Sequence, residues 1–156
     1  MNYGRAFVAG VLGGVAMSIG LAVGRTMGMP ANLELMLGTM MLPPGSGAWI
    51  AGFMMHLLIS GGIALTYTWT FEHITHRASA GIGAAFAIVH AVVGGLFMGM
   101  MPLIHPLIPE QMPAPGAFMS NMGMMGIVAE FALHILYGAV VGAVYGGAAV
   151  ARPLAA

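Results

Sequence analysis

Four long apolar stretches are the feature that most limits how this chain can fold. They cover residues of about 6–24, 48–71, 79–102 and 126–148, and a helix of roughly 20 apolar residues crosses the hydrocarbon core of a bilayer. Only 5% of the 156 residues are charged, with no Lys and no Asp among them. So few charges cannot solvate the surface of a water-soluble domain. The sequence therefore predicts an all-α integral membrane four-helix bundle, a single transmembrane domain over residues 1–156.

The arginines predict how this bundle lies in the membrane. Three of the four fall on one side of the predicted spans: Arg5, Arg77 and Arg152. The positive-inside rule places that side in the cytoplasm, against the single contrary position of Arg25. We expect a multi-pass protein of the bacterial inner (cytoplasmic) membrane with both termini cytoplasmic. The loops at about 25–47 and 103–125 then face outward, and "NLELMLGTMM" in the first is expected to be a short interfacial helix or a half-inserted segment.

Two segments resemble each other within the chain. When "MHLLISGGIALTY" is aligned with "LHILYGAVVGAVY", His56 matches His134 and Tyr67 matches Tyr145 at one offset, half the length of the chain. We interpret this as two tandem helical hairpin repeats, about 1–78 and 79–156, related by a pseudo-two-fold axis along the membrane normal. His56 and His134 would then lie at equivalent depth.

Small or polar side chains recur at every fourth position of the second and fourth spans. The first of these stripes contains His56, and the second contains Glu130 and His134. Transmembrane helices pack closely through such stripes, because lipid supplies no hydrophobic force between helices. We therefore expect these three side chains, and His90 on the third span, to point into the bundle. A similar stripe on the first span would suit a helix from the same or another chain.

These four polar residues predict a metal site. With a rise of about 1.5 Å per residue, His56 and His134 lie roughly 12 Å below the outer surface, His90 roughly 18 Å and Glu130 roughly 6 Å. All four then reach one cavity in the outer half of the membrane. Imidazole and carboxylate are usual ligands of zinc, iron and copper. We predict a metal ion held by His56, His90, Glu130 and His134, with His56 and His134 as the principal ligands.

Two alternatives stay open. Facing histidines on Gly-lined helices also suit a haem b, whose iron takes axial imidazoles, with Arg25 placed to pair with a propionate. Tight Gly–Gly packing leaves little room for a porphyrin, so a bare metal ion ranks first. In the other alternative the histidines only join helices by hydrogen bonds, and the chain is a non-catalytic membrane scaffold or assembly subunit. A transport pathway ranks lower, because the inner half has little polar lining.

Methionine is abundant, with 17 residues, most of them in or beside the outer loops. Thioether sulfur selects Cu(I), but Met is also an adaptable apolar filler. No catalytic motif is present in the sequence, neither a Gly-rich phosphate loop nor a nucleophile elbow, so we expect no catalysis by this chain alone. The formal net charge of zero gives no electrostatic basis for binding nucleic acid. Beyond the lipid bilayer, the expected partner is a larger membrane redox complex or a second copy of the chain.

Three segments carry a resemblance to a known group: "MLGTMM", "AWIAGFMMH" and "LHILYGAVVGAVYG". With them the chain resembles the YagU-like family of small four-helix bacterial inner-membrane proteins. The resemblance implies a membrane location and a four-helix fold, and it transfers no catalytic residue. The function expected from the residues is metal handling or a role as a small redox or accessory subunit.

Overall fold

The computed structural model describes residues 1–147 and is all-α over that range. Four of its helices are long and apolar enough to cross a membrane: α1 (Tyr3–Thr26), α3 (Ser46–His73), α4 (Ala80–Gly99) and α6 (Gly123–Gly147). They begin and end within a few residues of the predicted spans, so the predicted all-α fold is confirmed. Arg152 and the end of the second predicted repeat lie outside the described residues.

Short polar side chains set the starts of three helices. The side chains of Asn2 and Ser79 accept hydrogen bonds from backbone N–H groups in the first turns of α1 and α4. Asn32 does the same for α2 (Leu33–Gly38), which lies in the segment expected to be either a short interfacial helix or a half-inserted segment. Such caps satisfy N–H groups that have no partner inside the helix.

The helices pack through small residues, which on α1, α3 and α6 belong to the predicted stripes. Gly10 of α1 lies against Ser60 and Gly61 of α3, and Gly83 of α4 lies against the backbone of Gly138 in α6. The small-residue stripe of the first span is therefore used within the chain, by α3. Close backbone approach of this kind is how transmembrane helices associate.

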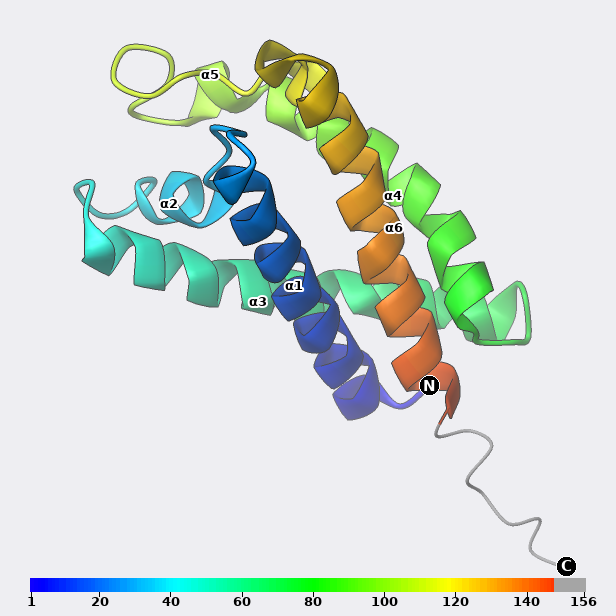
Figure 1. The fold of residues 1–156 in the computed structure, drawn as a ribbon. Helices are drawn as coiled ribbons and strands as arrows, with labels where there is room; N and C mark the ends of the chain where they lie inside the picture. The colour runs from blue at the N-terminus through cyan, green and yellow to red at the C-terminus, as the bar shows by residue number, and fades with distance from the viewer. Residues whose placement is uncertain (148–156) are drawn as a thin grey trace, which may run out of the picture.

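Neighbouring spans pair, but the two pairs are not joined symmetrically. α1 packs on α3, α4 packs on α6, and α6 also packs along α1. In Figure 1, α1, α6 and α4 run side by side while α3 crosses behind them. The backbones of α3 and α4 stay farther apart. The Tyr67 ring of α3 bridges them by packing edge-to-face against the Phe86 ring of α4, with the ring centroids 4.7 Å apart. The repeat stays a prediction, and the packing of the helices does not follow a two-fold pattern.

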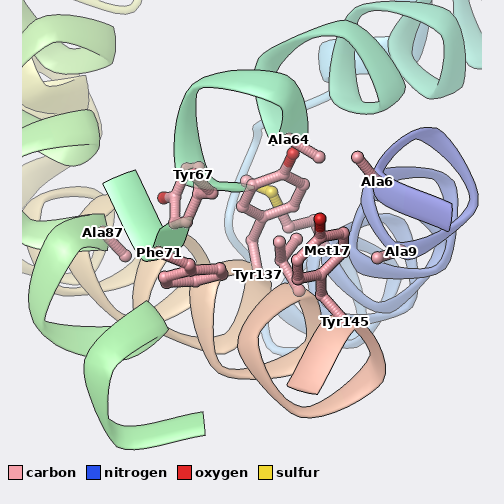
Figure 2. Close-up of a cluster of buried hydrophobic side chains, with 10 residues drawn as sticks. Ala6, Ala9, Met17, Ala64, Tyr67, Phe71, Ala87, Tyr137 and Tyr145 are labelled. Atoms are coloured by element: carbon pink, nitrogen blue, oxygen red, sulfur yellow. The ribbon is translucent and has the colours of Figure 1, made fainter. Parts of the chain in front are cut away.

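A cluster of aromatic and small side chains fills the half of the bundle that holds the N-terminus. Figure 2 shows Tyr67 and Phe71 of α3 beside Tyr137 and Tyr145 of α6. The Tyr137 hydroxyl donates a hydrogen bond to the carbonyl of Ser60, which fixes α6 on α3. This half is closed, so any internal space lies toward the other end.

Three short elements cover that other end: α2, α5 (Met101–Ile104) and the 3-10 helix η1 (Ala117–Met122). α2 packs on α3, and η1 packs on α4 and α6. The two loops that are expected to face outward are thus folded onto the bundle, as their apolar composition requires.

Candidate functional site

A cavity of about 450 Å³ lies between the four long helices and beneath α2 and η1. All four residues of the predicted metal site line it: His56, His90, Glu130 and His134. Most of the remaining lining is apolar. The structure thus brings the intramembrane polar residues to one cavity, although they come from three different helices.

Each of the three cavity histidines is held by the nitrogen Nδ1. His56 Nδ1 shares a hydrogen bond with the Ser18 hydroxyl at 3.0 Å, and His90 Nδ1 shares one with the Tyr67 hydroxyl at 3.0 Å. His134 Nδ1 donates to the Glu130 carbonyl at 2.7 Å. Because a carbonyl can only accept, His134 carries its proton on Nδ1 whenever it is neutral, which leaves the Nε2 lone pair free.

The Nε2 atoms are available to a ligand. Within residues 1–147 no hydrogen bond holds Nε2 of these three rings. An imidazole fixed through one nitrogen and open at the other is the usual arrangement of a metal-binding histidine. The same arrangement occurs at all three cavity histidines.

Two of the three imidazoles are in direct contact. The rings of His90 and His134 are perpendicular, with centroids 4.6 Å apart. Gly94 makes room for this contact, since a Cβ there would lie 3.0 Å from His134 Nε2 and 3.4 Å from Glu130 Oε1. His90, His134 and Glu130 therefore form the polar end of the cavity, beside Gly94. Rings in contact leave no space for a porphyrin between these two histidines.

Glu130 is a buried carboxylate without a full set of partners. Its residue is 5% exposed, and its Oε1 lies 3.6 Å from His134 Nδ1 with no hydrogen bond to any described residue. A buried polar atom left unsatisfied costs about 1–3 kcal/mol, and more when charged. The orphan oxygen therefore marks a place where a cation or a hydrogen-bond donor would be stabilised.

The four predicted ligands line one cavity without forming one ligand sphere. In residues 1–147, no three His or Glu side chains lie close enough together to hold a metal ion. The pair predicted as principal ligands was His56 with His134, whereas the two histidine rings in contact are His90 and His134. The metal site itself stays a prediction.

Six methionines also line the cavity, from four helices and a loop: Met17, Met36, Met98, Met112, Met119 and Met122. The sequence pointed to Met in the predicted outer loops, and the fold places several of these residues in the lining of the same cavity as the imidazoles. Met17, in the middle of the first span, was not singled out.

Arg25 and Glu34 form an ion pair that sequence reasoning missed. Glu34 is 0% exposed, and its Oε2 accepts a hydrogen bond from Arg25 at 3.1 Å. Arg25 also donates to the Ala31 carbonyl. The predicted use of Arg25, pairing with a haem propionate, is thus replaced by a pairing inside the chain. An available signal was that the two opposite charges stand on one outer loop.

His105 is a structural histidine. Its Nε2 donates to the Met36 carbonyl at 2.9 Å, and its Nδ1 accepts from the Leu107 N–H at 3.1 Å. The Thr39 hydroxyl is also within 3.2 Å of Nε2. With both nitrogens occupied, His105 fastens the second outer loop to α2.

Comparison of the chain with protein-family models, with curated proteins and with solved structures gave no match.

Proposed function

We propose that this chain is a membrane protein that binds a metal ion in the cavity, through Nε2 of His90 and Nε2 of His134. The observation that carries the proposal is the common arrangement of the cavity imidazoles, each held at Nδ1 and open at Nε2. Glu130 supplies a neighbouring carboxyl group with an oxygen that lacks a partner. His56, held by Ser18 on the same cavity, serves as an additional ligand or orients the others.

The proposed setting is the bacterial inner membrane, with both termini in the cytoplasm. The arginines on the side of the N-terminus support this orientation, and the resemblance to the YagU-like family fits the same location. The cavity then lies in the outer half of the membrane, beneath the folded outer loops. A metal ion held there suits metal handling on the outer side, or an accessory subunit beside a membrane redox enzyme.

Metal content measured on a matched pair of variants tests the proposal. The full chain is purified in mild detergent without chelators, and iron, copper and zinc are quantified. The site variant is His90→Asn/His134→Asn, because the Asn amide retains the hydrogen bond made at Nδ1 and removes Nε2. The control variant is His73→Ala/His76→Ala, whose imidazoles are exposed and bond only to backbone carbonyls of their own turn. We expect near-stoichiometric metal in the wild type and the control, and its loss in the site variant.

Two results would contradict the proposal. One is metal retained equally in all three proteins, and the other is no metal in the wild type even after supplementation. The second result would favour a scaffold, a role that two contacts between helices also support. His56 joins α3 to α1 through Ser18, and His90 joins α4 to α3 through Tyr67. In a scaffold each such bond contributes about 0.6 kcal/mol to stability and no metal is lost.

A further inference from the structure

The cavity is lined by more thioether side chains than imidazoles, and this bears on which metal it suits. Its lining holds six thioethers, three imidazoles and one carboxylate, and the chain has no cysteine. We infer that the cavity is a Cu(I) site, in which the imidazoles of His90 and His134 and the thioether of Met98 or of Met119 coordinate the ion. This inference rests on the proposed function and adds the identity of the metal.

The ligand geometry disfavours zinc. A structural zinc site takes four ligands from Cys, His or carboxylate side chains, and a catalytic one takes three. In the part of the chain that the structure describes, no three His or Glu side chains converge. A d¹⁰ Cu(I) ion tolerates low coordination numbers, so two imidazoles and one thioether can satisfy it. Soft thioether ligands also select Cu(I) over harder divalent ions.

Met98 is the first candidate for the sulfur ligand. His90, Gly94 and Met98 are spaced four residues apart on α4. Met98 therefore lies on the same face of that helix as His90, about two turns further along. All three residues line the cavity. Met119 belongs to η1, is 8% exposed and also lines the cavity.

The methionines come from segments that are far apart in the chain. Met17 belongs to α1, Met36 to α2, Met98 to α4, and Met119 and Met122 to η1. Met36 and Met119 lie on the elements that cover the cavity, between the polar end and the outer side. An ion that enters from the outer side would therefore meet the thioethers of the covering elements first and the imidazoles after them.

A packing role for these methionines makes a different prediction. Exchange of Met for Leu nearly conserves volume and is usually well tolerated in a core. If the sulfur atoms only fill space, Met98→Leu/Met119→Leu leaves metal binding unchanged. If they are ligands, the same variant loses affinity for Cu(I) while the fold is kept.

The test is a Cu(I) titration of the full chain in mild detergent under anaerobic, reducing conditions, in competition with the chromogenic chelator bicinchoninate. Zn(II) and Fe(II) binding are measured in parallel. The control is Met54→Leu, because Met54 is 53% exposed and lies outside the cavity. We expect near-stoichiometric Cu(I) in the wild type and in the control. In Met98→Leu/Met119→Leu we expect Cu(I) affinity lowered on the order of tenfold or more.

The outcomes separate the two proposals. Binding of Zn(II) or Fe(II) without Cu(I) overturns this inference and leaves the proposed function standing, whereas failure to bind any metal overturns both. Equal Cu(I) affinity in the wild type and the Met98→Leu/Met119→Leu variant also overturns the inference. Should that variant not fold, X-ray absorption at the copper edge of the wild type decides: sulfur scattering supports the inference, and nitrogen and oxygen scattering alone rejects it.

Discussion

At the scale of single residues, the hydrogen bonds of the imidazole nitrogens separate structural histidines from candidate ligands. His105 uses both nitrogens and is 4% exposed. His56, His90 and His134 use Nδ1 and leave Nε2 to the cavity. A free nitrogen on a fixed ring can bind a ligand at little cost in side-chain entropy.

His105→Ala is expected to destabilise the fold without affecting metal binding. The substitution leaves the Leu107 N–H without its partner, at about 1–3 kcal/mol for a buried group that stays unsatisfied. The Met36 carbonyl loses one hydrogen bond and keeps the one from the Thr39 hydroxyl. Thermal unfolding in detergent measures the loss, with the exposed His73→Ala as the control. A stable variant that has lost its metal would show that His105 acts as a ligand instead.

Arg25→Ala is expected to destabilise more than the double variant Arg25→Met/Glu34→Gln. The single change leaves the fully buried carboxylate of Glu34 unpaired. Removing one partner of a buried ion pair costs roughly 3–5 kcal/mol of stability. We expect a cost at the lower end of this range, because Arg25 is partly exposed. The double variant removes both charges together. Denaturation in detergent compares the two, and equal stability of both variants would mean that the pair contributes little.

At the scale of helices, the glycine faces decide how closely the spans approach. Gly83 and Gly138 bring α4 and α6 into backbone contact, and Gly10 does the same for α1 and α3. The sequence pattern identified these stripes on α1, α3 and α6. On α4 the tightly packed face is Gly83, Ala87, Ala91 and Gly95, which lies beside the face that carries His90 and opens to the cavity.

Gly83→Ala and Gly81→Ala form a matched pair on one helix. A Cβ at Gly83 would overlap the Gly138 carbonyl, whereas a Cβ at Gly81 meets nothing within 4 Å. We expect Gly83→Ala to force α4 away from α6 and to lower the unfolding temperature. Gly81→Ala should be neutral or stabilising by up to about 1 kcal/mol, since Ala is the better helix former. Equal effects of the two changes would argue against the tight α4–α6 contact.

At the scale of the whole molecule, the arginines predict the orientation of the bundle, and the absence of cysteine makes it measurable. A single cysteine placed at Met41, which is 63% exposed beyond α2, should react with a membrane-impermeant maleimide in intact cells. One placed at Ile74, 61% exposed at the opposite end of α3, should react only after the membrane is opened. The reverse labelling pattern would invert the topology and place the cavity on the cytoplasmic side.

Much of the candidate site was accessible from the sequence. The length of an apolar stretch identifies a membrane-spanning helix. The 3.6 residues per turn of that helix determine which side chains share a face, and its rise per residue determines the depth at which they lie. From these rules His56, His90, Glu130 and His134 could be assigned to one internal space. The tautomer of His134, the burial of Glu34 and the role of His105 could not, because each depends on a hydrogen-bond partner that helical periodicity does not specify.

The sequence by itself thus determined the four spans, their inward faces and the polar residues at the cavity. Only the tertiary structure decided which of these residues are neighbours. Because α6 packs between α1 and α4, His134 contacts His90 of α4. Periodicity is a property of one helix, whereas the order and crossing of helices follow from how their surfaces fit together. For the same reason, the gathering of six methionines at the cavity could only be seen in the folded chain.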